Sequence, residues 1–161
     1  MTKKTISYLL KTVVIFLLAA FLFAGFFLIP AALRLLQRYE PTLASIATGV
    51  AVYINLAFVP VYVCLLLAWK VFSTIGKDDA FCTQNARRLQ AASWLAIADT
   101  VMLIAFNGYL HATHPQLMGP FFLFLSLCLM LLGMAAAVVC FALSKLVLQA
   151  AELKQEVDLT V

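Results

Sequence analysis

The sequence predicts an all-α, polytopic membrane protein whose four transmembrane helices form a bundle, with the N- and C-termini in the cytoplasm. Three observations carry this prediction: the composition, the length of the apolar runs and the placement of the basic residues. Of the 161 residues, 65% are hydrophobic and 11% are charged, and the mean hydropathy is +1.05. A soluble domain is about half apolar and about a quarter charged, so lipid is the expected solvent.

Four apolar runs are long enough to cross about 30 Å of hydrocarbon, which takes about 20 helical residues. We expect a single membrane domain over residues 1–161, with spans at about 12–33, 43–72, 91–111 and 117–145. Backbone hydrogen bonds must close within each segment in lipid, which favours helices. The short alternating segments of an outer-membrane barrel do not occur in the sequence.

The basic residues set the expected orientation. Nine of the eleven Lys and Arg residues flank the side that holds the N-terminus, the loop 73–90 and the C-terminus, whereas only Arg34 and Arg38 fall on the other side. The positive-inside rule therefore places both termini and this loop in the cytoplasm. Lysines before the first run also occur in signal peptides, but this run is too long for one and lacks a clean cleavage site, so we expect an uncleaved span.

The cytoplasmic loop 73–90 contains the polar stretch DDAFCTQNARRLQ. Thr83 is the expected N-cap of a helix that begins at Gln84 and continues into the third span. Two interpretations stay open for the candidate residues of this loop, which either anchor the helix ends to anionic lipid or form a docking surface for a cytoplasmic partner. These candidates are Phe81, Arg87 and Arg88.

The C-terminal tail 146–161 is expected to continue the fourth helix as a short cytoplasmic stalk. Leu146, Leu153 and Val157 belong to an apolar seam whose period of about 3.5 residues is typical of helix packing. The seam can lie on lipid, pack on the cytoplasmic loop or meet another chain.

The candidate functional residues within the spans are Asn55, Asp99 and Asn107. An ionised carboxylate near the bilayer centre costs about 3 kcal/mol or more, so we expect Asp99 to face the bundle. Asp99 then either hydrogen-bonds one of the two asparagines or serves as a proton or cation site. Pro60 is expected to kink the second span.

The sequence contains no motif for catalysis, phosphate binding or paired carboxylate chemistry, so we expect neither enzyme activity nor a cofactor. His111 and His114 have no further ligands beside them, and the four cysteines have no C-x-x-C spacing, so no metal site is expected. The basic residues lie at the ends of apolar runs, which suits lipid phosphates, and no direct contact with nucleic acid is expected.

Three stretches carry a family resemblance. They are NLAFVP at 55–60, the Ala80–Phe81 pair followed by NARRL at 85–89, and the C-terminal segment 148–161. Together they resemble the YoaS-like family of small bacterial four-span membrane proteins of unknown function. The resemblance covers spans two to four and the C-terminus, and it departs at Asp78–Asp79, where members usually have a proline or a basic-acidic turn.

The resemblance implies a multi-pass protein of the bacterial cytoplasmic (inner) membrane. Members are often encoded beside a small helix-turn-helix regulator, which implies a membrane partner for a cytoplasmic transcriptional regulator. The expected function is therefore that of a non-catalytic interaction or regulatory protein in the lipid bilayer, bound to such a regulator or to another membrane protein. The alternatives are a small transporter or channel subunit that uses Asp99 and the Pro60 kink, and an accessory subunit of a larger membrane complex.

Overall fold

The protein is described by a computed structural model, which places residues 3–39, 46–75, 81–115 and 118–159. Its helices are α1 (Lys3–Phe23), the π-helical turn η1 (Ala24–Leu28), α2 (Ile29–Tyr39), α3 (Ala47–Ile75), α4 (Thr83–Thr113) and α5 (Pro120–Leu159). Four helical stretches are long and apolar enough to cross a membrane, and α1, η1 and α2 together form the first of them. The predicted all-α fold with four spans is confirmed.

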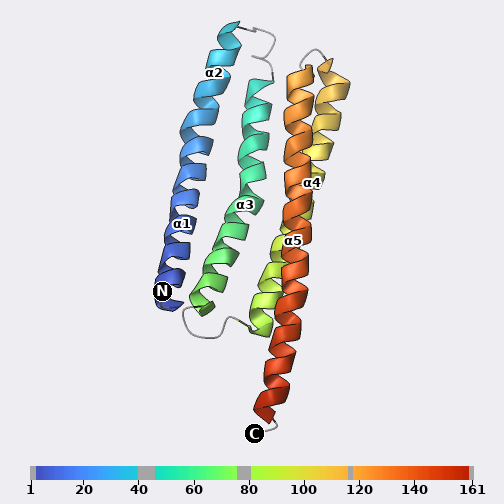
Figure 1. Cartoon of the computed structure of the whole chain (residues 1–161). Helices are drawn as coiled ribbons and strands as arrows, with labels where there is room; N and C mark the ends of the chain where they lie inside the picture. The colour runs from blue at the N-terminus through green and yellow to red at the C-terminus, as the bar shows by residue number, and fades with distance from the viewer. Residues whose placement is uncertain (1–2, 40–45, 76–80, 116–117, 160–161) are drawn as a thin grey trace.

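The helices run up and down in alternation (Figure 1), and the ends marked N and C lie toward the same end of the bundle. α1 packs on α3, α3 packs on α4, and α4 makes its most extensive contact with α5. The contacts thus follow the order α1, α3, α4, α5, and α1 and α5 are the outer helices of the bundle. Lipid-facing side chains cover its surface, for example Phe16 and Leu132, which are 72% and 68% exposed in the isolated chain.

The turn η1 arises from Pro30. This residue has no backbone N–H, and its ring clashes with the carbonyl of the residue four positions earlier. The chain responds by widening one turn, so that the N–H of Ile29 bonds to the carbonyl of Ala24, five residues back. A π-helical turn of this kind is rare and often marks a functional part of a helix. Pro60, where the sequence predicts a kink, lies inside α3 with α-helix on both sides, and that kink stays a prediction.

The contact between α4 and α5 follows a seven-residue repeat of small and polar side chains. On α4 the buried members are Ala86, Ser93, Thr100 and Asn107, and on α5 they include Ala137, Ser144 and Ala151. Two hydroxyl groups bond across the contact: Ser93 Oγ donates to the carbonyl of Ala137 (2.9 Å) and Ser144 Oγ to that of Ala86 (2.8 Å). Small residues let helix backbones approach closely in lipid, where the contact depends on packing and hydrogen bonds.

The other contacts between neighbouring helices also use side chains that bond to backbone. Ser7 Oγ on α1 donates to the carbonyl of Phe72 on α3 (2.6 Å). Farther along the same pair, the rings of Phe21 and Phe58 meet edge to face with their centroids 5.6 Å apart. These contacts hold α1 against the part of α3 from Phe58 to Phe72.

The helices extend into the range expected to be loop. α3 ends at Ile75 and α4 begins at Thr83, whereas part of the polar stretch, with Asp78 and Asp79, lies outside the described residues. The N-cap position belongs to Cys82, and it makes no side-chain cap bond. The prediction that Thr83 is the N-cap is therefore wrong: the carbonyl of Cys82 accepts from the N–H groups of Asn85 (3.0 Å) and Ala86 (3.3 Å), so the helix starts one residue earlier.

Candidate functional site

The candidate site is a cavity of about 670 Å³ between the spans. All four spans contribute to it: Phe21 and Leu33 come from the first, Ile46 directly precedes α3, and the other lining residues come from α3, α4 and α5. Most of its wall is apolar. The side chains with polar atoms are few, and they are Tyr53, Asp99, Thr100, Asn107 and Ser126.

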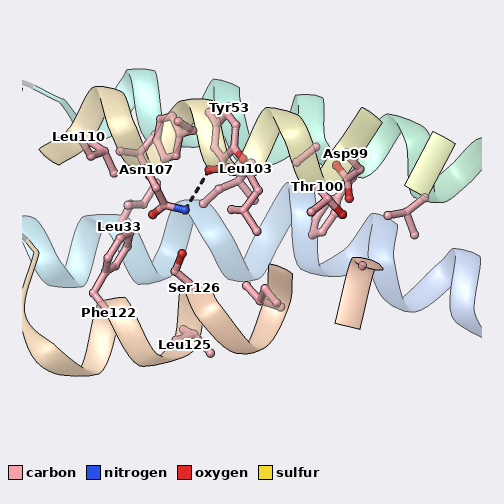
Figure 2. A pocket seen from close by; sticks show the side chains of 18 of the residues that line it. Leu33, Tyr53, Asp99, Thr100, Leu103, Asn107, Leu110, Phe122, Leu125 and Ser126 are labelled. Carbon is pink, nitrogen blue, oxygen red and sulfur yellow. Dashed lines mark hydrogen bonds between the residues drawn. The ribbon is translucent and has the colours of Figure 1, made fainter. Parts of the chain in front are cut away.

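Helix α4 supplies most of the polar wall. Asp99, Leu103 and Asn107 recur at intervals of four residues, which places them on one helical face. Figure 2 shows Asp99 and Thr100 toward one end of the cavity and Asn107 toward the other. The structure thus brings two of the three predicted intramembrane candidates into one site.

Asn107 is 9% exposed, and its two amide atoms differ in their contacts. Nδ2 donates to the carbonyl of Leu103 (2.9 Å), whereas Oδ1 has no hydrogen-bond partner among the described residues. The side chain points into the cavity toward Ser126 of α5 (Figure 2). A buried acceptor without a donor costs about 1–3 kcal/mol, so this oxygen is suited to a donor that enters the cavity.

Aromatic rings form much of the remaining wall. Tyr53 of α3 and Phe106 of α4 are stacked, with centroids 3.5 Å apart and an interplanar angle of 7°. Phe21, Phe58 and Phe122 also line the cavity, so rings from every span reach it. Sequence inspection did not single out these rings or Ser126, because aromatic and small residues occur throughout the spans.

Asn55 lies outside this cavity. Its Nδ2 donates to the carbonyl of Ala51 (2.8 Å), one turn earlier on the same helix. Its Oδ1 faces η1, where a Cβ atom on Gly25 would come within 3.1 Å of it. Neither Asn55 nor Asn107 hydrogen-bonds the Asp99 carboxyl group, so the first of the two alternatives for Asp99, a bond to one of these asparagines, is not observed. Each amide instead donates to the carbonyl of its own preceding turn.

Pro60 does not itself line the cavity, although its neighbours Phe58 and Val61 do. His111 and His114 lie near the far end of α4. Among the described residues there is no group of three or more His, Cys, Asp or Glu side chains that would hold a metal ion.

A second polar cluster joins α3 to the start of α4. Asn85 is fully buried, and its Nδ2 donates to Thr74 Oγ1 (2.5 Å). Arg88 donates through Nη1 to Asn85 Oδ1 (2.9 Å) and to the carbonyl of Lys70 (3.3 Å). The neutral amide of Asn85 thus bonds to the Thr74 hydroxyl and the Arg88 guanidinium group, and these bonds hold the end of α3 against the start of α4. In the sequence, Asn85 stood out only as part of the NARRL stretch that carries the family resemblance.

The three predicted loop candidates therefore differ in burial and in what they contact. Arg88 is partly buried and bonds within the protein, whereas Arg87 is exposed and Phe81 is 57% exposed. Phe81 and Arg87 are the two that can reach lipid headgroups or a partner.

The predicted seam on α5 points away from the α4 contact. Leu146 is 60% exposed and Leu153 is 62% exposed, whereas Ala151 between them is 8% exposed. The side chain of Val157 lies outside the described residues. The buried face of α5 is the adjacent one, because it carries the small residues that fit against α4.

Comparison with known proteins places this chain in a family. Residues 33–161 match the family described as "Protein of unknown function (DUF2975)". The chain is also 27% identical over 135 residues to the uncharacterized membrane protein YoaS of Bacillus subtilis (strain 168), a match that covers 84% of each chain. No solved structure matches it. The chain is a membrane protein with four candidate transmembrane helices, and it belongs to the DUF2975 family.

Proposed function

We propose that this chain is a non-catalytic protein of the bacterial cytoplasmic membrane that acts by binding another protein at its cytoplasmic end. The observation that carries the proposal is the extent of α5. This helix continues to Leu159 and reaches beyond the ends of α3 and α4 (Figure 1), with Leu146 and Leu153 exposed on one side. Exposed leucines at a spacing of seven residues are the pattern with which helices pack on protein partners.

The proposed orientation is N-in/C-in. It rests on the distribution of the basic residues. Nine lie near the N-terminus, the 73–90 region or the C-terminus, whereas only Arg34 and Arg38 lie at the opposite end. This orientation puts the exposed part of α5 in the cytoplasm. The proposed partner is a small cytoplasmic transcriptional regulator, held at the membrane by contact with α5 and with the exposed Phe81 and Arg87.

Site-specific photo-crosslinking in cells tests this proposal. A photoreactive residue at position 153 should form an adduct with a cytoplasmic helix-turn-helix protein, identified by mass spectrometry. The matched control is position 132, where Leu132 is similarly exposed but lies in the middle of the apolar part of α5. Adducts with lipid only, or the same protein adduct at both positions, would contradict the proposal, and an adduct with another membrane protein would replace the regulator as partner.

A second candidate function is that of a small transporter or channel subunit. The observation in its favour is that Asp99 lines a cavity between the spans. Proton and cation flux into reconstituted vesicles should then depend on this carboxyl group. A flux in the wild type that Asp99→Asn abolishes would favour transport over protein binding, and absence of flux in both would remove this candidate.

A further inference from the structure

Two side chains that line the cavity between the spans, Asp99 and Asn107, have acceptor oxygens without a donor among the described residues. Asn107 Oδ1 is buried and unpartnered within the described residues. Asp99 adds a carboxyl group to the same wall, and the structure gives it no hydrogen bond within the described part of the chain. Buried polar groups in proteins are almost always satisfied by protein, water or ligand, so an occupant with donor groups is expected here.

The electrostatic character of the cavity wall is negative. Among the described residues, no Lys, Arg or His lines the cavity, and Asp99 supplies its one carboxyl group. An anionic occupant would find no counter-charge. A cation would find the carboxyl group of Asp99 in surroundings of low dielectric constant, where attraction between charges is stronger than in water.

The apolar wall sets the second requirement. The stacked pair Tyr53 and Phe106 stands with Phe21, Phe58 and Phe122 around the cavity, so five aromatic rings line it. Aromatic faces attract cations and pack against flat apolar bodies. A volume of about 670 Å³ also falls within the roughly 300–1,000 Å³ of typical small-molecule sites.

We propose that this cavity binds a lipophilic organic cation, a protonated amine or iminium group on an aromatic or apolar body. The cationic group lies at the Asp99 end. Asn107 is eight residues farther along α4, which is about 12 Å at the helical rise of about 1.5 Å per residue. A second donor on the far side of the ligand therefore meets Asn107 Oδ1.

Two other occupants explain the cavity less well. A lipid acyl chain would fill the apolar part but has no donor for Asn107 Oδ1. Water would supply a donor, but an ordered water needs two to four polar partners, and most of this wall has none to offer.

The contacts between the helices also leave an entry route for the ligand. The outer helices α1 and α5 pack mainly on α3 and α4, so a ligand dissolved in lipid can enter between α1 and α5. This ligand site is independent of the proposed protein contact at the end of α5.

Fluorescence titration of the purified full-length protein in an uncharged detergent tests the proposal. The probe is ethidium, a planar aromatic cation with two amino donors, and the comparison probe is the aromatic anion anilinonaphthalene sulfonate. The wild type should bind ethidium and reject the anion. Asp99→Asn and Asn107→Leu should each weaken ethidium binding by about tenfold to a hundredfold, since a hydrogen bond to a charged group contributes about 1.5–3 kcal/mol.

Two variants outside the cavity serve as matched controls. Glu152→Gln neutralises an exposed carboxyl group on α5, and Gln90→Leu removes an exposed amide from α4. Both should bind ethidium as the wild type does, and size-exclusion chromatography and circular dichroism should show all four variants folded. No binding of ethidium by the wild type, equal binding of the anion, or equal binding by Asp99→Asn and Glu152→Gln would overturn the proposal. Native mass spectrometry that finds phospholipid retained and not displaced by ethidium would overturn it in favour of an acyl chain.

Discussion

Gly133 of α5 lies in close contact with Thr100 of α4, and replacing it with alanine tests this contact. A Cβ atom at this position would overlap Thr100 Oγ1, whereas the nearest other atom is Thr100 Cβ at 3.7 Å. Thr100 is a poor candidate for moving aside, because β-branched side chains have few allowed rotamers in a helix. Its hydroxyl group also donates to the carbonyl of Ala96 (2.8 Å).

The magnitude follows from two opposing effects. Alanine in place of glycine inside a helix stabilises by roughly 0.5–1 kcal/mol, and overpacking costs about 1–3 kcal/mol. Gly133→Ala should therefore lower the free energy of unfolding by about 1 kcal/mol in the wild type. In a Thr100→Ala background the overlapping oxygen is gone, and the same substitution should raise it by roughly 0.5–1 kcal/mol.

The assay is unfolding by sodium dodecyl sulfate in mixed micelles, followed by far-ultraviolet circular dichroism, for both single variants and the double variant. The control is Gly108→Ala on α4, where an added Cβ meets no atom within 4 Å. The sign of the Gly133→Ala effect should reverse with Thr100→Ala, an interaction energy of roughly 2 kcal/mol. If Gly133→Ala behaves like Gly108→Ala in both backgrounds, the proposed close contact of α4 and α5 is wrong.

Three further predictions concern other parts of the chain. Asn85→Ala should lower the free energy of unfolding by about 1–3 kcal/mol, because the partly buried Thr74 hydroxyl and Arg88 guanidinium groups lose their bonds to the buried amide; the exposed neighbour in Gln84→Ala should show no change in the same unfolding assay. Gly25→Val should destabilise by about 1–3 kcal/mol, since even a Cβ meets Asn55 Oδ1 at 3.1 Å; Gly49→Val, in open space, should change the unfolding midpoint little. In a variant whose other three cysteines are serine, a membrane-impermeant thiol reagent should label Cys82 in inverted vesicles but not in intact cells, and labelling in intact cells would refute the proposed orientation.

Much of the fold follows from the sequence by itself. Length and hydropathy predict the four spans, because a helix is the economical way to satisfy the backbone in lipid. Four helical spans that alternate in direction bring the ends marked N and C toward the same end of the bundle, as Figure 1 shows. The seven-residue repeat of small and polar residues from Ala86 to Asn107 is also visible in the sequence, and it marks one face of α4 without naming the helix that this face meets.

The tertiary structure decided which polar residues meet. Asn55, Asp99 and Asn107 look equivalent in the sequence, because each is a polar residue in an apolar run. In the folded chain Asp99 and Asn107 line the cavity, whereas Asn55 faces the π-helical turn of the first span. Sequence spacing assigns a residue to a face of its own helix, but the neighbour that this face meets depends on how each helix is rotated in the bundle. That rotation is set by close packing at contacts such as Gly133 on Thr100, between residues far apart in the chain.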